Sequence, residues 1–313
     1  MPYHLIGDVH GCATTLAKLL DRLGYLNSNG TYRHETHTAI FLGDFIDRGP
    51  FQRQVIGIVR PMIDTGAALA VMGNHEFNAI AYHTPAEAEN TWLRAHSEKH
   101  SKQHAAFLRA YERDDEARAE VIEWFKQLPL WLDLGSLRVV HACWDDKLIQ
   151  RISTFQNGSA LLSDALLRAA SRPGTWQFDA LETLLKGKEI KLPAGQSFAD
   201  KDKNIRHNIR VRWWDDNATT FRKAYIGPES ARTHIPDDQI EGDHLVTYTA
   251  KAPPVFIGHY WLEGEPEPIA TNIACVDYSV AKPGGKLVAY CWDGEQVLNK
   301  AGFVSVDRLE PDR

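Results

Sequence analysis

The chain has 313 residues, of which 43% are hydrophobic and 24% are charged, enough for one large folded domain or two modest ones. Acidic residues outnumber basic ones by 41 to 35, and the formal charge of −6 argues against nucleic acid or an anionic membrane as a partner. Neither a signal peptide nor an apolar run of membrane-spanning length is visible, which predicts a cytoplasmic protein.

Five short apolar runs recur along the chain, and each ends in polar side chains of the kinds that bind metals. They are YHLIGDVHG from residue 3, TAIFLGDFIDRG from 38, ALAVMGNHE from 68, LRVVHACW from 137 and PPVFIGHYW from 253. Their length and composition predict buried strands. Because ligands collect beyond the carboxyl ends of strands in open sheets, we expect six side chains to converge on one site. They are Asp8, His10, Asp44, Asn74, His141 and His259.

Helical patterns lie between these runs. Leucines recur at helix spacing at positions 16, 19, 20 and 23, and Gly24 predicts the end of that helix. The segment TPAE at residues 84–87 has the pattern of a capping box with proline at the first helical position, and it predicts a helix running toward Trp124. Strands alternating with helices favour an α/β fold. No internal repeat or low-complexity linker divides the chain, so we expect a single domain over residues 1–313.

The six candidate ligands offer carboxylate, imidazole and amide donors, which suit divalent manganese, iron or zinc. Six ligands exceed what one open catalytic site needs, so we predict two ions about 3.5–4 Å apart with Asp44 bridging them, an arrangement used for in-line attack on phosphorus. Because Asn74 is neutral, two divalent ions against Asp8, Asp44 and a hydroxide leave an excess of positive charge for a phosphate.

Three motifs carry a resemblance to a known family. GDVHG at 7–11, GDFIDRG at 43–49 and GNHE at 73–76, followed by single histidines at His141 and His259, resemble the calcineurin-like metallophosphoesterases. They are most similar to the phosphoprotein phosphatase branch, with its bacterial serine/threonine or tyrosine protein phosphatases and diadenosine tetraphosphatases. The segment NIACVDYSVAKPGGKLVAY at 272–290 is similar to the last hairpin of the family. The resemblance implies a central two-sheet β-sandwich flanked by helices.

The resemblance also implies a role for each motif residue. Arg48 would grip phosphate oxygens, His75 would protonate the leaving oxygen, and Asp47 would orient His75. Glu76 is expected to shape the GNHE loop. Two divalent ions would be bound, with manganese favoured over iron or zinc. One would be held by Asp8, His10 and Asp44, and the other by Asp44, Asn74, His141 and His259.

The predicted reaction is metal-dependent hydrolysis of phosphomonoesters, by attack of a hydroxide that bridges the two ions. The expected substrate is a phosphorylated protein or a small phosphoester. Trp261 stands where relatives that cleave diesters carry a second histidine, which favours monoesters. The alternative is a dinucleoside tetraphosphate hydrolase, since a compact chain that starts at the first motif resembles those enzymes. A non-catalytic scaffold is less favoured because every expected position is filled.

Substrate choice is expected to lie in an insertion of roughly residues 145–250. Within it, the segment NIRHNIRVRWWDD at 204–216 would place Arg210, Arg212 and Trp214 on one face of a strand and apolar residues on the other. One interpretation is a second phosphate clamp, with Arg212 slightly preferred over Arg210. The other is a half-buried strand whose arginines are solvated.

Histidines and cysteines outside the motifs receive simpler interpretations. His96, His100 and His104 repeat every four residues and could line one helical face as a metal site, but the interleaved charges favour an exposed polar face. The four cysteines, at positions 12, 143, 275 and 291, show no paired spacing, so we expect free thiols.

Overall fold

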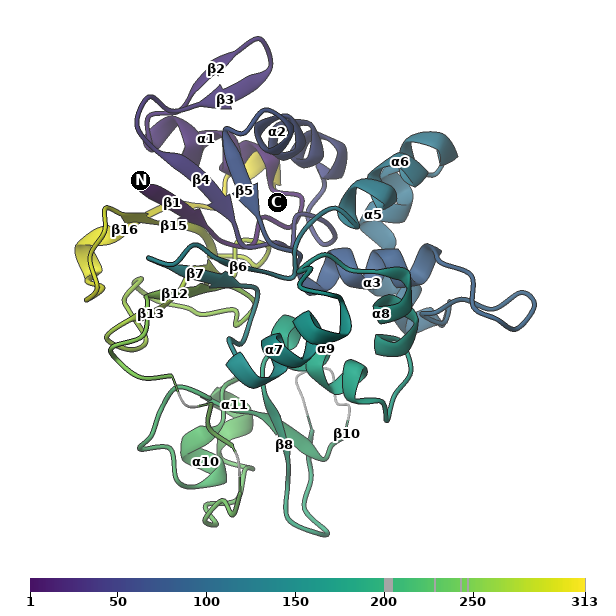
Figure 1. Cartoon of the computed structure of the whole chain (residues 1–313), viewed down its shortest axis with the longest axis vertical. Coiled ribbons are helices and arrows are strands. Elements are labelled where there is room, and N and C mark those ends of the chain that lie inside the picture. The colour runs from purple at the N-terminus through teal and green to yellow at the C-terminus, as the bar shows by residue number, and fades with distance from the viewer. Residues whose placement is uncertain (200–204, 228, 243, 247, 313) are drawn as a thin grey trace.

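A computed structural model describes residues 1–199, 205–227, 229–242, 244–246 and 248–312 (Figure 1). Each of the five apolar runs forms a short strand, as the sequence predicts. These strands are β1 (Tyr3–Ile6), β4 (Thr38–Phe41), β5 (Ala68–Ala70), β7 (Arg138–Val140) and β12 (Val255–Ile257).

The strands form two main sheets. In the first sheet, β1 lies between β4, which is parallel to it, and β15 (Lys286–Trp292), which is antiparallel. Strand β5 extends this sheet beyond β4, while β14 (Asp277–Tyr278) and β16 (Phe303–Asp307) pair antiparallel with β15. The second sheet has the order β13 (Ile273–Cys275), β12, β7, β6 (Trp131–Asp133), in which only β6 is antiparallel.

An apolar layer joins the two sheets. Leu5, Ile40 and Val71 from the first sheet and its strand ends share one fully buried cluster with Val139 and Phe256 from the second. Burial of these side chains supplies the main favourable free energy for stacking the sheets. The structure therefore confirms the two-sheet sandwich that the family resemblance implies.

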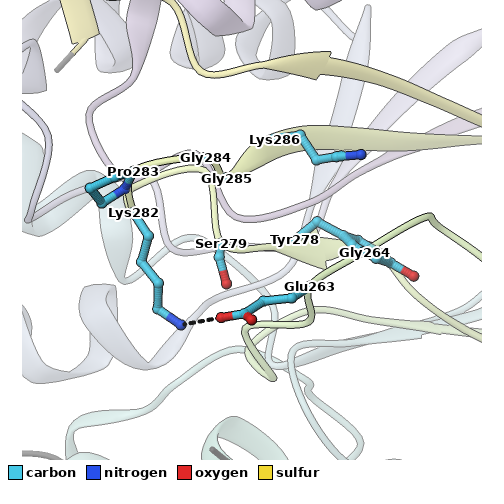
Figure 2. Close-up of a pocket in the computed structure, with 9 residues that line it drawn as sticks. All are labelled: Glu263, Gly264, Tyr278, Ser279, Lys282, Pro283, Gly284, Gly285 and Lys286. Atoms are coloured by element: carbon cyan, nitrogen blue, oxygen red, sulfur yellow. Dashed lines mark ion pairs between the residues drawn. The ribbon is translucent and has the colours of Figure 1, made fainter.

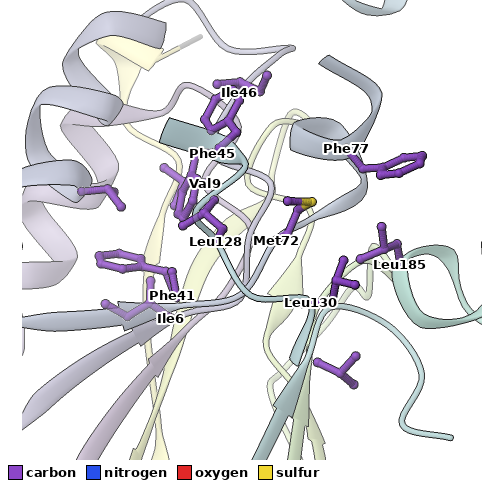
Figure 3. Close-up of a cluster of buried hydrophobic side chains, with 14 of the residues drawn as sticks. Ile6, Val9, Phe41, Phe45, Ile46, Met72, Phe77, Leu128, Leu130 and Leu185 are labelled. Carbon is purple, nitrogen blue, oxygen red and sulfur yellow. The ribbon is translucent and has the colours of Figure 1, made fainter. Parts of the chain in front are cut away.

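Helices cover the outer faces of the sandwich (Figure 1). Helix α1 (Ala13–Arg22) packs on β15 and β16, and α2 (Gln52–Asp64) packs on β5. The leucines of α1 face the core and Gly24 follows in the left-handed conformation, as predicted. Figure 3 shows the large apolar cluster, from Phe41 on the first sheet to Phe77 on α3 (Asn74–His83) and Leu185 on α9 (Trp176–Lys186).

The remaining helices and strands are short. The helices are α4 (Glu98–Gln103), α5 (Ala105–Ala110), α6 (Asp115–Phe125), α7 (Asp146–Phe155), α8 (Asp164–Ala170), α10 (Phe221–Ala224) and α11 (Glu229–Arg232), with 3-10 turns at Lys300–Gly302 and Glu310–Asp312. The strands are β2 (Leu26–Ser28), β3 (Thr31–Arg33), β8 (Glu189–Lys191), β9 (Phe198–Ala199), β10 (Ile205–Arg206) and β11 (Asn208–Arg210). Within the described ranges, no helix is both long and apolar enough to cross a membrane.

The prediction that a helix begins at the segment TPAE is wrong. Helix α3 already runs from Asn74 and ends at His83, so Thr84 lies at its C-terminal end instead of opening a new helix. Thr84 is extended, because a residue before proline is pushed out of the helical region, and Pro85 then pairs with Trp92 in an isolated bridge. The next helix begins only at Glu98.

Part of the predicted insertion has an apolar cluster of its own. Ile209 and Val211 lie in it beside side chains from β9 and α10, separate from the sandwich core. The predicted alternation is present, since Ile209, Val211 and Trp213 are buried while Arg210 and Arg212 are half-buried, although β11 ends at Arg210. The first residue of the predicted segment, at position 204, lies outside the described residues.

Truncation of Phe256 should destabilise the whole sandwich. Phe256 is fully buried on β12, three residues before His259, and packs against Tyr290 of the other sheet. We expect Phe256→Ala to lower the free energy of unfolding by about 3–5 kcal/mol in urea denaturation. The control Phe155→Ala removes a ring that is 41% exposed and should cost far less. Equal losses in the two variants would contradict this description of the core.

Candidate active site

The six predicted ligands come together where the strands end. Each side chain follows one of the strands β1, β4, β5, β7 and β12, and none is more than 8% exposed. Two groups have donor atoms within 4.8 Å of one another: His10, Asp44 and His75, and Asp44, His141 and His259. Asp44 belongs to both groups, which is the position expected of a bridging ligand.

The first group is built around the ring of His10. Its Nε2 lies 3.7 Å from Asp44 Oδ2 and 3.9 Å from Asp8 Oδ2. Its Nδ1 donates a hydrogen bond to the carbonyl oxygen of Ile46 at 3.0 Å, which fixes the ring and leaves Nε2 aimed at the carboxylates. Nε2 is buried and has no hydrogen-bond partner in the part of the chain that the structure describes. A buried acceptor of this kind fits a metal ion.

The second group surrounds the amide of Asn74. Its Oδ1 lies 2.7 Å from Nδ1 of His259 and 3.2 Å from Nε2 of His141, and the latter atom lies 3.4 Å from Asp44 Oδ2. Nδ1 of His141 donates to the carbonyl oxygen of Leu42 at 2.6 Å and so orients the ring. Oxygen and imidazole donors from four segments therefore face a common space, and this donor set fits divalent manganese, iron or zinc.

The charges of the site also fit bound cations. Burial raises the pKa of Asp8 well above its usual range, and the nearby carboxylate of Asp277 adds to the increase. Burial opposes ionisation of Asp44 as well, but the imidazoles of His141 and His75 hold its pKa well below the usual range. In turn, and against the effect of burial, Asp44 raises the pKa of His141 to about 10. Buried carboxylates placed this close together need compensating positive charge.

Glu76 shapes the GNHE loop, as the sequence predicts, and it also holds the loop that carries Asp44. Its Oε2 accepts hydrogen bonds from the backbone N–H groups of Asp44 at 2.7 Å and Gly73 at 3.0 Å, and its Oε1 accepts one from Phe45 at 2.8 Å. Asp44 has a φ of 52°, in the left-handed region that non-glycine residues seldom adopt. Gly73 passes so close to Asp44 that a Cβ atom there would clash with it.

His75 faces the metal-donor cluster with one ring nitrogen and Asp47 with the other. Its Nδ1 donates to Asp47 Oδ2 at 2.6 Å, and its Nε2 lies 3.9 Å from Asp44 Oδ2. Burial opposes protonation of His75, but the carboxylates of Asp44 and Asp47 raise its pKa. This arrangement allows His75 to carry a proton at the atom nearest to the donor cluster.

The prediction that His104 lies on an exposed polar face is wrong. Its side chain is buried, and its Nδ1 donates to Asp47 Oδ1 at 2.9 Å. Helix α4 ends at Gln103 and α5 begins at Ala105, so His104 lies at the junction of the two helices and not on the exposed face of α4. The apolar residues that follow it, at positions 105–107, were the sequence feature that indicates burial of His104.

Arg48 lies at the solvent side of the site. Its guanidinium stacks 4.0 Å from the centre of the Trp261 ring, and that ring lies 5.5 Å from the ring of His10. Lys282 contacts the same indole at 4.8 Å, and Figure 2 shows it pairing with Glu263 across a small pocket, with Nζ and Oε1 3.5 Å apart. Trp261 thus supports a cationic group beside the metal donors.

Sequence reasoning missed Asp277, which supports Trp261. Its buried Oδ2 accepts a hydrogen bond from the backbone N–H of Trp261 at 2.7 Å, and Oδ1 accepts one from Ser279 at 3.0 Å. The signal was present, because Asp277 ends the apolar run IACV in the same way that Asp8 and Asp44 end theirs.

The insertion brings Arg210 toward the site. Burial lowers the pKa of His259, and the positive charge of Arg210 lowers it further. Among the described residues, the buried Nε of Arg210 has no hydrogen-bond partner, while its Nη2 lies 3.7 Å from Glu189 Oε1. Trp213 is fully buried and donates to the Tyr260 hydroxyl at 3.0 Å, so its ring belongs to the core.

Two overlapping groups of metal donors at the strand ends of an α/β sandwich are the arrangement of a metallohydrolase. A sequence model of the family described as Calcineurin-like phosphoesterase matches residues 1–259. The chain therefore belongs to the calcineurin-like phosphoesterase family, which consists of hydrolases and implies divalent metal ions at this site. The resemblance seen in the sequence motifs is confirmed.

Two relatives by sequence share one activity in their names. The bis(5'-nucleosyl)-tetraphosphatase PrpE (asymmetrical) of Oceanobacillus iheyensis is 32% identical over 162 residues, which make up 50% of this chain and 63% of that protein. The PrpE of Bacillus subtilis is 41% identical over 76 residues, covering 24% of this chain and 31% of that protein. This chain thus spans less than two thirds of the length of these curated relatives.

Two solved structures with the same fold are protein phosphatases by their titles. A protein serine/threonine phosphatase from Saccharomyces cerevisiae aligns over 99% of this chain and 81% of its own, with a TM-score of 0.54 and 15% identity. A cold-active protein tyrosine phosphatase aligns over 92% of this chain and 73% of its own, with a TM-score of 0.51 and 16% identity. These similarities concern the fold alone.

Replacing Glu76 should disturb both the loops and the metal site. In Glu76→Gln, an N–H group replaces one acceptor oxygen and meets backbone N–H donors, so we expect a loss of about 1–3 kcal/mol in unfolding free energy. Metal content, measured by elemental analysis after reconstitution, should fall with it. Glu116→Gln changes an exposed acid on α6 and serves as the control. Unchanged metal content and stability in Glu76→Gln would show that this carboxylate does not hold the loops.

Proposed function

We propose that this protein hydrolyses phosphomonoesters by transferring the phosphoryl group directly to water. The observation that carries the proposal is a pair of buried metal-donor groups that share Asp44, one of which contains the His75 imidazole held by Asp47, with the guanidinium of Arg48 at their solvent side. Each of these parts has a distinct task in phosphoryl transfer, and the reaction needs all of them.

The proposed metal ions bind at the two donor groups. Bound divalent ions polarise phosphoryl oxygens and lower the pKa of water, which supplies a nucleophile at neutral pH. Manganese is favoured by the family resemblance, with iron or zinc as alternatives. The residues proposed for one ion are Asp8, His10 and Asp44, and those for the other are Asp44, Asn74, His141 and His259.

Arg48 and Arg210 are the proposed phosphate-binding residues. The guanidinium of Arg48 is stacked on Trp261 and so is oriented before a substrate arrives, which lowers the entropic cost of binding a phosphate. Arg210 approaches from the insertion on the side of His259 and has a buried donor available. Arg212, which the sequence slightly preferred, is half-buried beside it and is the second candidate.

His75 is the proposed general acid. As the bond between phosphorus and the leaving oxygen breaks, the proton on Nε2 of His75 passes to that oxygen, while Nδ1 stays hydrogen-bonded to Asp47. The negative charge of Asp47 stabilises the protonated ring before transfer and keeps Nε2 directed at the donor cluster. Proton delivery matters most for leaving groups that are poor when unprotonated, such as the alkoxide of a serine residue.

The choice of monoesters rests on Trp261. The indole fills the position two residues after His259 and is already engaged by Arg48, so it supports a clamp for a terminal phosphate. A phosphorylated protein or a small phosphoester fits such a site.

Hydrolysis of dinucleoside tetraphosphates is the second candidate, because the relatives named PrpE carry that activity in their names. Trp214 could stack on a base, since it is half-buried, whereas Trp213 is fully buried.

A substrate panel tests the proposal. Metal-stripped protein reconstituted with manganese should turn over p-nitrophenyl phosphate and phosphopeptides faster than diadenosine tetraphosphate. Asp44→Asn should lower kcat by at least ~10³-fold, because it removes the shared ligand charge. Its unfolding midpoint should stay close to that of wild type, and Asp21→Asn, an exposed acid on α1, should retain full activity. Activity retained in Asp44→Asn would overturn the two-metal site, and a strong preference for the dinucleotide would favour the second candidate.

Two matched variants identify the second phosphate clamp. Arg210→Gln should raise KM for p-nitrophenyl phosphate about 10–100-fold, the loss expected for one charged hydrogen bond to phosphate. Arg212→Gln, two residues away and equally half-buried, should change KM little. The reverse result, in steady-state kinetics of the two variants, would assign the clamp to Arg212.

A further inference from the structure

We propose that His104 is a positioning residue that holds Asp47 in the orientation needed to direct His75 at the leaving group. The inference rests on the proposed role of His75 as general acid. It extends the pair of His75 and Asp47 to a chain of three buried side chains from three different segments of the fold.

The geometry places Asp47 between two imidazoles. Oδ2 accepts from Nδ1 of His75 at 2.6 Å, and Oδ1 accepts from Nδ1 of His104 at 2.9 Å. The three side chains are 3%, 9% and 5% exposed for Asp47, His75 and His104 respectively. Each carboxylate oxygen thus has its own imidazole donor, and rotation of the carboxylate would break both hydrogen bonds inside a buried environment.

His104 is itself held in place by packing. Its ring stacks on Phe107 with centres 4.8 Å apart and planes at 18°, and its Nε2 lies 3.4 Å from Nε2 of His83 on α3. Because α5 begins directly after His104, the ring is fixed at the junction of two helices. A donor fixed in this way can orient Asp47 without itself moving.

The hydrogen bond from His104 also supports the charge of Asp47. Burial favours the neutral carboxyl, and the hydrogen bonds from His104 and His75 overcome this effect and hold the pKa of Asp47 well below its usual range. Asp47 therefore stays a carboxylate that keeps the proton on Nδ1 of His75. His104 is not a member of either metal-donor group, and its hydrogen bond to the site is the one to Asp47.

Two isosteric variants separate the hydrogen bond from the packing. In His104→Asn, the side-chain amide places an N–H close to the position of Nδ1, whereas His104→Leu has the same shape without a donor. Both lose the ring that packs on Phe107, so the difference between them reports the hydrogen bond to Asp47. His100→Leu removes a histidine from the neighbouring helix α4, one that bonds the carbonyl oxygen of Ala95, and serves as the control.

The readout is the dependence of kcat on the leaving group, with manganese-loaded full-length protein. Phenyl phosphate needs protonation of its leaving oxygen far more than p-nitrophenyl phosphate does. We expect His104→Leu to lower kcat for phenyl phosphate ~10-fold more than for p-nitrophenyl phosphate, with His104→Asn recovering most of the loss and His100→Leu resembling wild type. Combined with Asp47→Asn, His104→Leu should have no further effect.

Three outcomes decide the proposal and keep it distinct from the proposed function. Equal losses on both substrates in His104→Leu, or no difference between the Leu and Asn variants, would overturn the role of His104. If His75→Asn still lowered kcat selectively for phenyl phosphate in that case, the proposed function would stand without it. Absence of wild-type turnover on both substrates would overturn the proposed function and this inference together.

Discussion

The buried carboxylate of Asp44 is the constraint on which the site depends. Its backbone N–H bonds to Glu76, its carbonyl oxygen accepts hydrogen bonds from Val9 and His10, and its Oδ1 accepts one from the N–H of His75. One residue therefore ties together the loops after β1, β4 and β5. Its other oxygen, Oδ2, is left to face the imidazoles of both donor groups. A charge in such a place is stable only if cations or hydrogen-bond donors surround it.

The residues and loops around Asp44 provide the surroundings that this buried charge needs. Histidines held by backbone carbonyls direct their other ring nitrogens toward the carboxylates. Glycines allow the loops to approach closely, and residues in the left-handed region turn the side chains inward. The strain of those conformations, about 1–3 kcal/mol each, is tolerated because the sandwich core fixes both ends of each loop. The apolar layer between the sheets thus has a functional consequence, since it holds the strand ends that carry the ligands.

The motifs made much of the site predictable because they are local. A buried strand must be apolar, and the turn after it must expose polar groups. Both properties can be recognised from neighbouring residues such as Ile6, Gly7 and Asp8. The bond of Glu76 to Gly73 inside the GNHE loop was also predictable, but its bonds to Asp44 and Phe45, more than 30 residues away, were not. Asp277 shows the limit of this reasoning: its run has the same pattern, but its use as a support for Trp261 depends on a loop that begins at residue 258.

The sequence by itself determined the strands of the sandwich and the candidate ligand types at their ends, because local periodicity and strand-end position encode them, whereas the pairing of His75 with Asp47 was implied by the family resemblance. Only the tertiary structure decided that His104 is buried against Asp47, 57 residues away, and that Thr84 ends a helix instead of starting one. The burial of Trp213 against Tyr260, 47 residues away, was decided in the same way. These outcomes depend on which distant surfaces pack together, and packing is fixed by the whole core, whose contacts join segments that no short window of sequence contains.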